Sequence, residues 1–201
     1  MVVKVLNLYV GLGGNREQWE GCEVTAVEIN PDIALIYQER FPQDKMIVGD
    51  AHEYLRQNYA DFDFIWSSPP CPSHSRARFW NTKAERIYPD MTLYQEIIFL
   101  KHHFKGKWVV ENVVPYYEPL IEGEKIGRHM FWSNFEIKIQ YTSQRVKVES
   151  GNLESFEAEC GFSTKGVGKG MDRYRAIRNM VCPILGGAIF NCVFNEERDW
   201  L

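Results

Sequence analysis

Residues 62–72 read FDFIWSSPPCP, a bulky apolar run followed by a turn rich in proline. The run over 62–66 has the length and bulk of a buried strand. Pro69 and Pro70 end that strand, so Cys71 is expected on a stiff turn just past its carboxyl end. In open α/β sheets, ligands bind at this edge. A thiol is a strong nucleophile near neutral pH, so Cys71 is a candidate nucleophile, with a structural role in the turn as the alternative.

The segments around this stretch alternate between expected strands and helices. Apolar runs predict strands at 2–9, 23–28, 45–48, 62–66 and 107–111. Helical patterns begin at Pro31 and cover 51–59 and 91–104. The alternation predicts an α/β fold, with a doubly wound, mostly parallel Rossmann-like sheet and helices on both faces.

The pattern loosens in the second half of the chain. Residues 130–141 alternate like one or two antiparallel strands. The Gly-rich segment over about 142–172 is interpreted as loop, and 173–190 as a terminal helix that Pro183 would kink or break. We expect one domain over residues 1–201.

Composition narrows the class of protein. The chain is 45% hydrophobic and 25% charged, with a net charge of −4, which argues against a large non-specific DNA clamp. No run reaches the length of a membrane span, and no signal peptide is evident. The five cysteines show no CxxC spacing, so neither a metal cluster nor a disulfide framework is indicated. A cytoplasmic protein without metal fits best.

Three strand ends carry groups that suit a nucleoside. The glycine turn over 9–14, YVGLGG, permits close approach of a ligand to the backbone. Glu28 closes the next strand, where a carboxylate can accept from ribose hydroxyls, and Asp50 follows the third. The alternative is a tight turn beside a solvated glutamate. Together the three ends predict a nucleoside-type cofactor.

Glu111 follows the buried run over 108–110 and opens the segment Glu-Asn-Val. A carboxyl there is either solvated or partly desolvated, and desolvation favours its protonated form. A thiol with such an acid is suited to addition at C6 of a pyrimidine ring, because the acid can contact N3 and the exocyclic amine.

On these motifs the chain resembles the cytosine-C5 DNA methyltransferases. Residues 7–14 look like the family's S-adenosylmethionine loop, 68–71 like its Pro-Cys nucleophile motif, 111–113 like its Glu-Asn-Val motif and 174–181 like its C-terminal cofactor motif. The resemblance implies a methyltransferase with Cys71 as nucleophile, Glu111 as acid, and Arg128 as the arginine that supports a flipped cytosine through O2. It implies S-adenosylmethionine contacts from Tyr9, Gly11, Leu12, Gly13, Glu28, Ile29, Asp50, Ala51, Pro70, Asn179 and Val181.

The implied substrate is DNA, with the target base rotated out of the stack. By resemblance, Cys71 adds to C6, C5 takes the methyl group, and loss of the C5 proton releases the enzyme. Ser75, Arg76 and Arg78 match the family's mobile catalytic loop and suit phosphates, with a solvated basic loop as the alternative.

The chain also departs from the family pattern. Pro72 replaces a glutamine, Arg178 replaces a glycine, and Arg145 rivals Arg128 because the paired-arginine pattern is reduced. The segment over 142–172 is too short for an ordinary target-recognition domain.

Several interpretations follow from these departures. The first is a compact enzyme of the kind that suits a phage, a mobile element or a restriction-modification system. Others are an accessory, regulatory or split subunit whose partner or second copy supplies recognition, and a modifier of free pyrimidine nucleotides. An amino-group methyltransferase is disfavoured, because that class resembles Asp/Asn-Pro-Pro-Tyr/Phe at this strand end.

Overall fold

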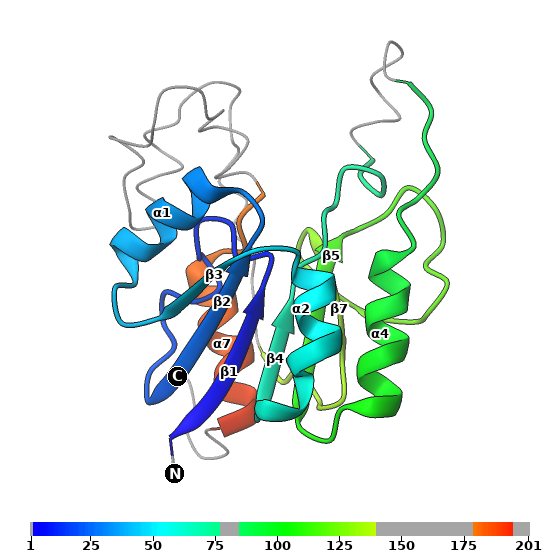
Figure 1. The fold of residues 1–201 in the computed structure, drawn as a ribbon. Helices are drawn as coiled ribbons and strands as arrows, with labels where there is room; N and C mark the ends of the chain where they lie inside the picture. Colours follow the sequence, from blue (N-terminus) through cyan, green and yellow to red (C-terminus); the bar gives the residue numbers. More distant parts are fainter. Residues whose placement is uncertain (1, 77–84, 140–178, 195–201) are drawn as a thin grey trace.

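The computed structural model describes residues 2–76, 85–139 and 179–194, which form one seven-stranded sheet with helices on both faces (Figure 1). Its strands are β1 (Val3–Leu8), β2 (Cys22–Glu28), β3 (Lys45–Val48), β4 (Phe64–Ser67), β5 (Lys107–Val113), β6 (Glu124–Ile126) and β7 (His129–Ser133). Their order is β3-β2-β1-β4-β5-β7-β6. The first five are parallel, whereas β7 is antiparallel to both of its neighbours. From β1 the strands are added toward one side of the sheet as far as β3, and from β4 they are added toward the other side. Open α/β sheets bind ligands at such a change in strand order, which here lies between β1 and β4.

Helices cover the sheet on both sides. They are α1 (Pro31–Arg40), α2 (Ala51–Asn58), the short 3₁₀ helix η1 (Tyr59–Asp61), α4 (Thr92–His103) and α7 (Pro183–Phe194). In Figure 1, α2 and α4 lie in front of the sheet and α7 lies behind it. The strands alternate accordingly: Leu6 and Leu8 pack with α2 and α4, while Val5 packs with α7. The predicted doubly wound, Rossmann-like α/β fold is therefore confirmed.

Local sequence explains where two of these helices begin. Asn30 caps α1, because its side chain accepts from the backbone N–H groups of Asp32 and Ile33, and Pro31 occupies the first position. Asp50 caps α2 by accepting from Glu53 N at 3.0 Å. Both helices thus start directly after a strand end, which fixes Glu28 and Asp50 at the same edge of the sheet.

The second half of the chain differs from its prediction in two places. Of the one or two antiparallel strands expected over 130–141, the described residues contain one, which ends at Ser133, and residues 134–139 form no strand. Its partner β6 was not predicted, because it has only three residues, two of them exposed. The segment over 142–172 lies outside the described residues.

The terminal helix, predicted over 173–190, begins later than the sequence indicates. It starts at Pro183, and residues 179–182 are not helical. A proline lacks the N–H that a helix interior needs, but the first turn leaves that N–H unpaired in any case, so Pro183 begins the helix and does not kink it. Residues 173–178 lie outside the described part of the chain.

The last helix packs on the segment that follows β1. Trp19 donates from Nε1 to the carbonyl of Gly186 at 3.2 Å, and its ring stacks on Phe190 with centroids 4.9 Å apart. A Cβ on Gly186 would lie 2.5 Å from the Asn15 backbone, so only glycine permits this approach. Among the described residues, no helix is both long enough and apolar enough to cross a bilayer.

Candidate functional site at the carboxyl edge of the sheet

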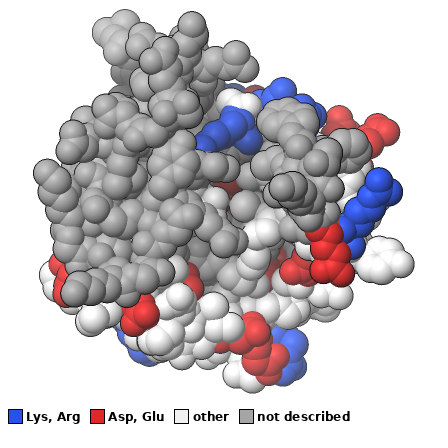
Figure 2. Space-filling view, turned by 90° about the horizontal axis from the view of Figure 1, so that it is seen from above, with Lys and Arg blue, Asp and Glu red and all other residues white. Residues whose placement is uncertain are grey.

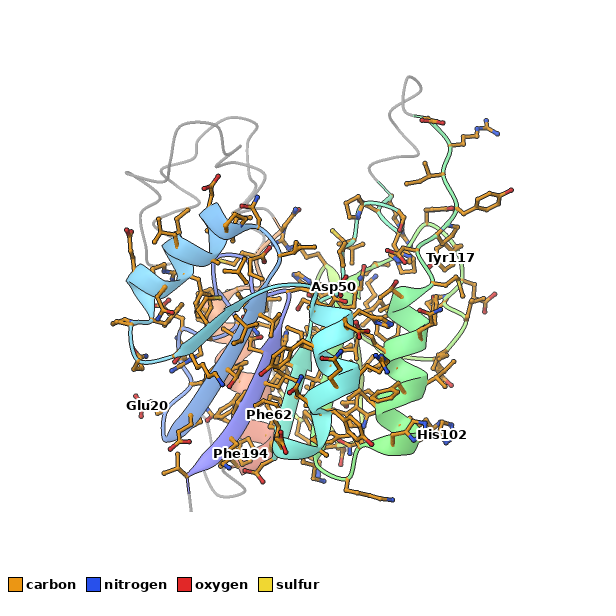
Figure 3. All side chains as sticks on the ribbon, viewed as in Figure 1. Glu20, Asp50, Phe62, His102, Tyr117 and Phe194 are labelled. Atoms are coloured by element: carbon orange, nitrogen blue, oxygen red, sulfur yellow. The ribbon has the colours of Figure 1, made fainter. Side chains whose placement is uncertain are left out.

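The parallel strands end together at one edge. Leu8 pairs with Val27 on one side and Ser67 on the other, and Ser67 pairs with Val110. The segments that follow these residues therefore meet. In Figure 3, Asp50 and Tyr117 lie at this edge, while Phe62 and His102 lie at the opposite end.

The glycine turn after β1 is shaped by left-handed backbone. Tyr9, Gly11 and Gly13 have φ of 56°, 53° and 75°. Gly11 N donates to Glu28 Oε2 at 3.1 Å, and Asn30 N donates to Oε1 of the same carboxylate at 2.9 Å. A Cβ on Gly11 would meet no heavy atom within 4 Å, so open space lies over this glycine where a ligand can approach.

The remaining predicted cofactor residues differ in exposure. Ile29 leaves 66% of its surface exposed beside Glu28, and Asp50 is exposed at the start of α2. Leu12 and Ala51 are buried, and Pro70 is exposed. Carboxylate acceptors, an apolar side chain and open space over a glycine thus adjoin one another. These residues fit a nucleoside with its ribose on Glu28 and its base near Asp50.

The nucleophile turn is held by its backbone. The Cys71 carbonyl accepts from His74 N at 3.0 Å and from Ser75 N at 3.1 Å. Cys71 is partly exposed and forms no disulfide. The Asn112 side chain donates from Nδ2 to the Pro69 carbonyl at 2.9 Å. This buried bond joins the Glu-Asn-Val strand to the Pro-Pro-Cys turn, which are separated by 43 positions in the sequence.

Glu111 is buried on β5 and contacts the antiparallel strand β7. His129 Nδ1 lies 2.5 Å from Glu111 Oε1, and each side chain is 7% exposed. Arg128 Nε donates to His129 Nε2 at 3.1 Å, and Arg128 Nη2 donates to the Met180 carbonyl at 2.9 Å. The structure thus brings the predicted residues Glu111 and Arg128 together, with His129 between them.

A second buried carboxylate, Glu96 on α4, was missed by the sequence interpretation. It is fully buried and accepts from Tyr9 Oη at 2.6 Å and from the Ser67 hydroxyl, and it lies 3.0 Å from His52 Nδ1. Burial and then the Glu96 charge raise the pKa of Tyr9, so the phenol stays protonated and donates. The hydrogen bond to Glu96 raises the pKa of His52. The sequence signal for Glu96 is its position as a charged residue beside the apolar residues Leu93 and Ile97 of the helix.

The other predicted residues lie around this edge. Ser75 forms an isolated bridge with Pro115, and Arg76 Nε donates to the Pro115 carbonyl at 3.1 Å. Asn179 is exposed and Val181 is buried. A Cβ on Gly14 would lie 2.3 Å from the Val181 carbonyl, so this segment packs against the glycine turn. Arg78 and Arg145 lie outside the described residues.

Figure 2 looks down on this edge, where the Lys and Arg side chains of the described surface are interspersed with Asp and Glu. No continuous basic face appears there among those residues. Within the described part of the chain, no group of three or more His, Cys, Asp or Glu residues is arranged to hold a metal ion.

Comparison with known proteins gives the family. The model of the C-5 cytosine-specific DNA methylase family matches residues 3–116, more than half of the chain. The chain belongs to this family. The matched residues include the glycine turn, Glu28, Asp50, Cys71 and Glu111. The predicted resemblance to cytosine-C5 methyltransferases is therefore confirmed.

The solved structures that are similar to this chain match only part of it. A mutant DNMT2 from Spodoptera frugiperda is 24% identical, with a TM-score of 0.39 over 55% of this chain and 35% of that one. A prophage-encoded DNA modification methyltransferase from E. coli, described as putative, is 22% identical, with a TM-score of 0.40 over 58% and 33%. A conserved hypothetical protein from Streptococcus pyogenes is 14% identical, with a TM-score of 0.45 over 66% and 86%. The chain thus spans about a third of the DNMT2 and prophage chains. No curated protein matches it.

Proposed function

We propose that this chain is a DNA (cytosine-5)-methyltransferase that uses S-adenosylmethionine. The observation that carries the proposal is the hydrogen bond from Asn112 to Pro69. It couples the strand that bears Glu111 to the turn that bears Cys71, at the edge where Glu28 and open space over Gly11 suit a nucleoside. This contact supports the proposal, because Cys71 follows β4 and Glu111 lies on β5, and both strands end at the same edge as Glu28.

The cofactor, when bound, supplies an electrophilic methyl group. Glu28 would hold its ribose, Ile29 would cover its base, and Asp50 would accept from the adenine amine. Tyr9, Gly11, Leu12, Gly13, Ala51, Pro70, Asn179 and Val181 would complete the pocket.

The protein groups then act on the target base. The Cys71 thiolate forms a bond to C6 while Glu111 stabilises the charge that develops at N3. The electron pair moves to C5, which becomes nucleophilic toward the methyl group. Loss of the C5 proton to water and elimination of the Cys71 thiolate restore the aromatic ring. Because C5 and C6 are inaccessible in a duplex, the base must leave the stack, and Ser75, Arg76 and Arg78 are proposed to hold the flanking phosphates.

The test is transfer of tritium from S-adenosyl[methyl-³H]methionine to unmethylated DNA. Wild type is expected to form 5-methylcytosine, and Cys71→Ser to form none while keeping its fold. Cys22→Ser is the matched control, because Cys22 is also a partly buried, non-disulfide cysteine, and it starts β2 at the opposite end of the strand. This control should keep full activity.

Other outcomes would overturn the proposal. Transfer to free deoxycytidine nucleotides but not to DNA would indicate a nucleotide modifier. Cofactor binding without transfer to duplex or single-stranded DNA would indicate a subunit that requires a partner. Equal activity of wild type and Cys71→Ser would remove the covalent mechanism.

A further inference from the structure

The pairing between β5 and β7 places a histidine against the acid of the proposed reaction. Glu111 pairs with Phe131 and Val113 pairs with His129, so the side chains of Glu111 and His129 share one face of the sheet as diagonal neighbours. The imidazole Nδ1 and the carboxylate Oε1 are 2.5 Å apart. Among the residues that the structure describes, His129 alone hydrogen-bonds to this carboxylate.

The protonation of this histidine follows from its other neighbour. Arg128 Nε always carries its hydrogen, and it donates to His129 Nε2 at 3.1 Å. Nε2 must therefore present its lone pair, so the single proton of the neutral ring sits on Nδ1. That N–H points at Glu111 Oε1. A second ring proton, on Nε2, would face the guanidinium directly.

Arg128 is itself held in place. Its Nη2 donates to the Met180 carbonyl at 2.9 Å, in the segment that packs on the glycine turn through Gly14. The chain of contacts thus runs from residue 180 through Arg128 and His129 to Glu111. In each of these hydrogen bonds only one of the two groups can donate, so the direction of the bond is determined.

From this geometry we propose that His129 is the positioning residue of Glu111 and that Arg128 acts through it. Resting on the proposed function, the inference assigns each oxygen of the carboxyl a task. Oε1 accepts from His129, and Oε2 faces the base. Since Oε1 already accepts from His129, the proton that Glu111 donates in the proposed reaction sits on Oε2. It passes from there to N3 of the pyrimidine, breaking an O–H bond and forming an N–H bond, and returns when the adduct collapses. Arg128 is thereby assigned a role that acts through His129.

The first test concerns the tautomer and needs no substrate. In two-bond ¹H–¹⁵N spectra of ¹⁵N-histidine-labelled wild type at neutral pH, the His129 ring should show a protonated Nδ1 and a bare Nε2. Arg128→Ala should allow protonation of Nε2. Spectra of His129→Asn identify the signal. A wild-type ring protonated on Nε2, or on both nitrogens, would overturn the inference.

The second test separates positioning from packing. An asparagine amide can mimic the Nδ1–H donor, whereas leucine fills similar volume without a donor. His129→Leu should lower kcat by about 100-fold with KM for DNA and for the cofactor unchanged, since a misplaced catalytic group costs that much. His129→Asn should restore most of kcat. His102→Leu, at the opposite end of the molecule (Figure 3), is the control for the effect of a His-to-Leu substitution far from the site, and its kcat should match wild type.

The kinetic outcomes are decisive in both directions. Equal losses in His129→Leu and His129→Asn, or no loss in either, would show that the ring only packs. Should the wild-type protein transfer no methyl group to DNA, the proposed function fails, and the tautomer measurement still decides whether Arg128 and His129 hold Glu111 as inferred.

Discussion

Replacing Asp44 by alanine should destabilise the fold through a buried ion pair. Arg16, just after the glycine turn, donates to the Asp44 carboxylate from Nε at 2.9 Å and from Nη2 at 3.0 Å. The Tyr37 hydroxyl donates to the same carboxylate at 2.7 Å. The side chains of Arg16 and Asp44 are only 6% and 1% exposed. Burial, and then the Asp44 charge, raise the pKa of Tyr37, so its hydroxyl remains a donor.

The size of the effect follows from what remains after truncation. Asp44→Ala leaves a buried guanidinium that keeps, among the described residues, the hydrogen bond from Nη1 to the Trp19 carbonyl at 2.7 Å, together with a Tyr37 hydroxyl that has lost its acceptor. Removing one partner of a buried pair costs about 3–5 kcal/mol. For a chain of this size the melting temperature should fall by roughly 6–20 °C. Arg16→Met should cost a similar amount, because it leaves the Asp44 carboxylate buried without its cation.

The assay is urea unfolding followed by tryptophan fluorescence, with the single variant Asp44→Leu and the double variant Arg16→Met/Asp44→Leu alongside. Removing both charges together should recover most of the loss, since a buried pair is often replaceable by apolar groups. The matched control is Glu53→Ala, which breaks the exposed pair with Arg56 and should leave the midpoint close to wild type. A loss below about 1 kcal/mol for Asp44→Ala, or additive losses in the double variant, would refute the reasoning.

Three further outcomes are expected. In thermal unfolding, Gly13→Ala should destabilise the protein by about 1–3 kcal/mol, because the added Cβ would lie 2.5 Å from the Phe41 ring at a φ of 75°. Gly11→Ala should cost only about 1–2 kcal/mol in the same assay, because its φ of 53° is unfavourable but open space surrounds the added Cβ. Leu185→Ala, 1% exposed, should cost about 2–5 kcal/mol by urea titration. The bond to Glu96 raises the pKa of His52, so its stabilising contribution is fully present below pH of about 6.5 and is lost as pH rises through the folded-state pKa. The stability difference between wild type and His52→Gln should therefore shrink between pH 5.5 and pH 9.

The carboxyl edge of the sheet could be predicted from the sequence because its residues follow strands directly. Glu28, Asp50, Cys71 and Glu111 each stand at or just past an apolar run. Parallel pairing of those runs then places the residues together with no further information. The order of apolar runs in the sequence is enough to predict this edge because the parallel strands follow a common order, β3-β2-β1-β4-β5.

The partners of these residues could not be predicted in the same way. His129 meets Glu111 only through the register of an antiparallel pair, in which Glu111 opposes Phe131. Glu96 reaches Ser67 only because α4 packs on that face of the sheet. Contacts of this kind depend on how two elements dock. The error in the start of the terminal helix has a different cause, because a proline in a helical pattern indicates either a break or a first turn, and Pro183 occupies the first turn.

The packing of α7 on the segment after β1 has a consequence for how the chain is made. The hydrogen bond from Trp19 to Gly186 joins residues 167 positions apart, and the backbone of Asn15 fits against the same glycine. During synthesis β1 leaves the ribosome well before α7, although α7 packs on the segment that follows the glycine turn. The nascent chain therefore cannot complete the packing around Asn15 and Trp19 until α7 has emerged and docked. A chain that stops before Pro183 should remain open to proteolysis between Asn15 and Trp19, whereas the full chain should resist it.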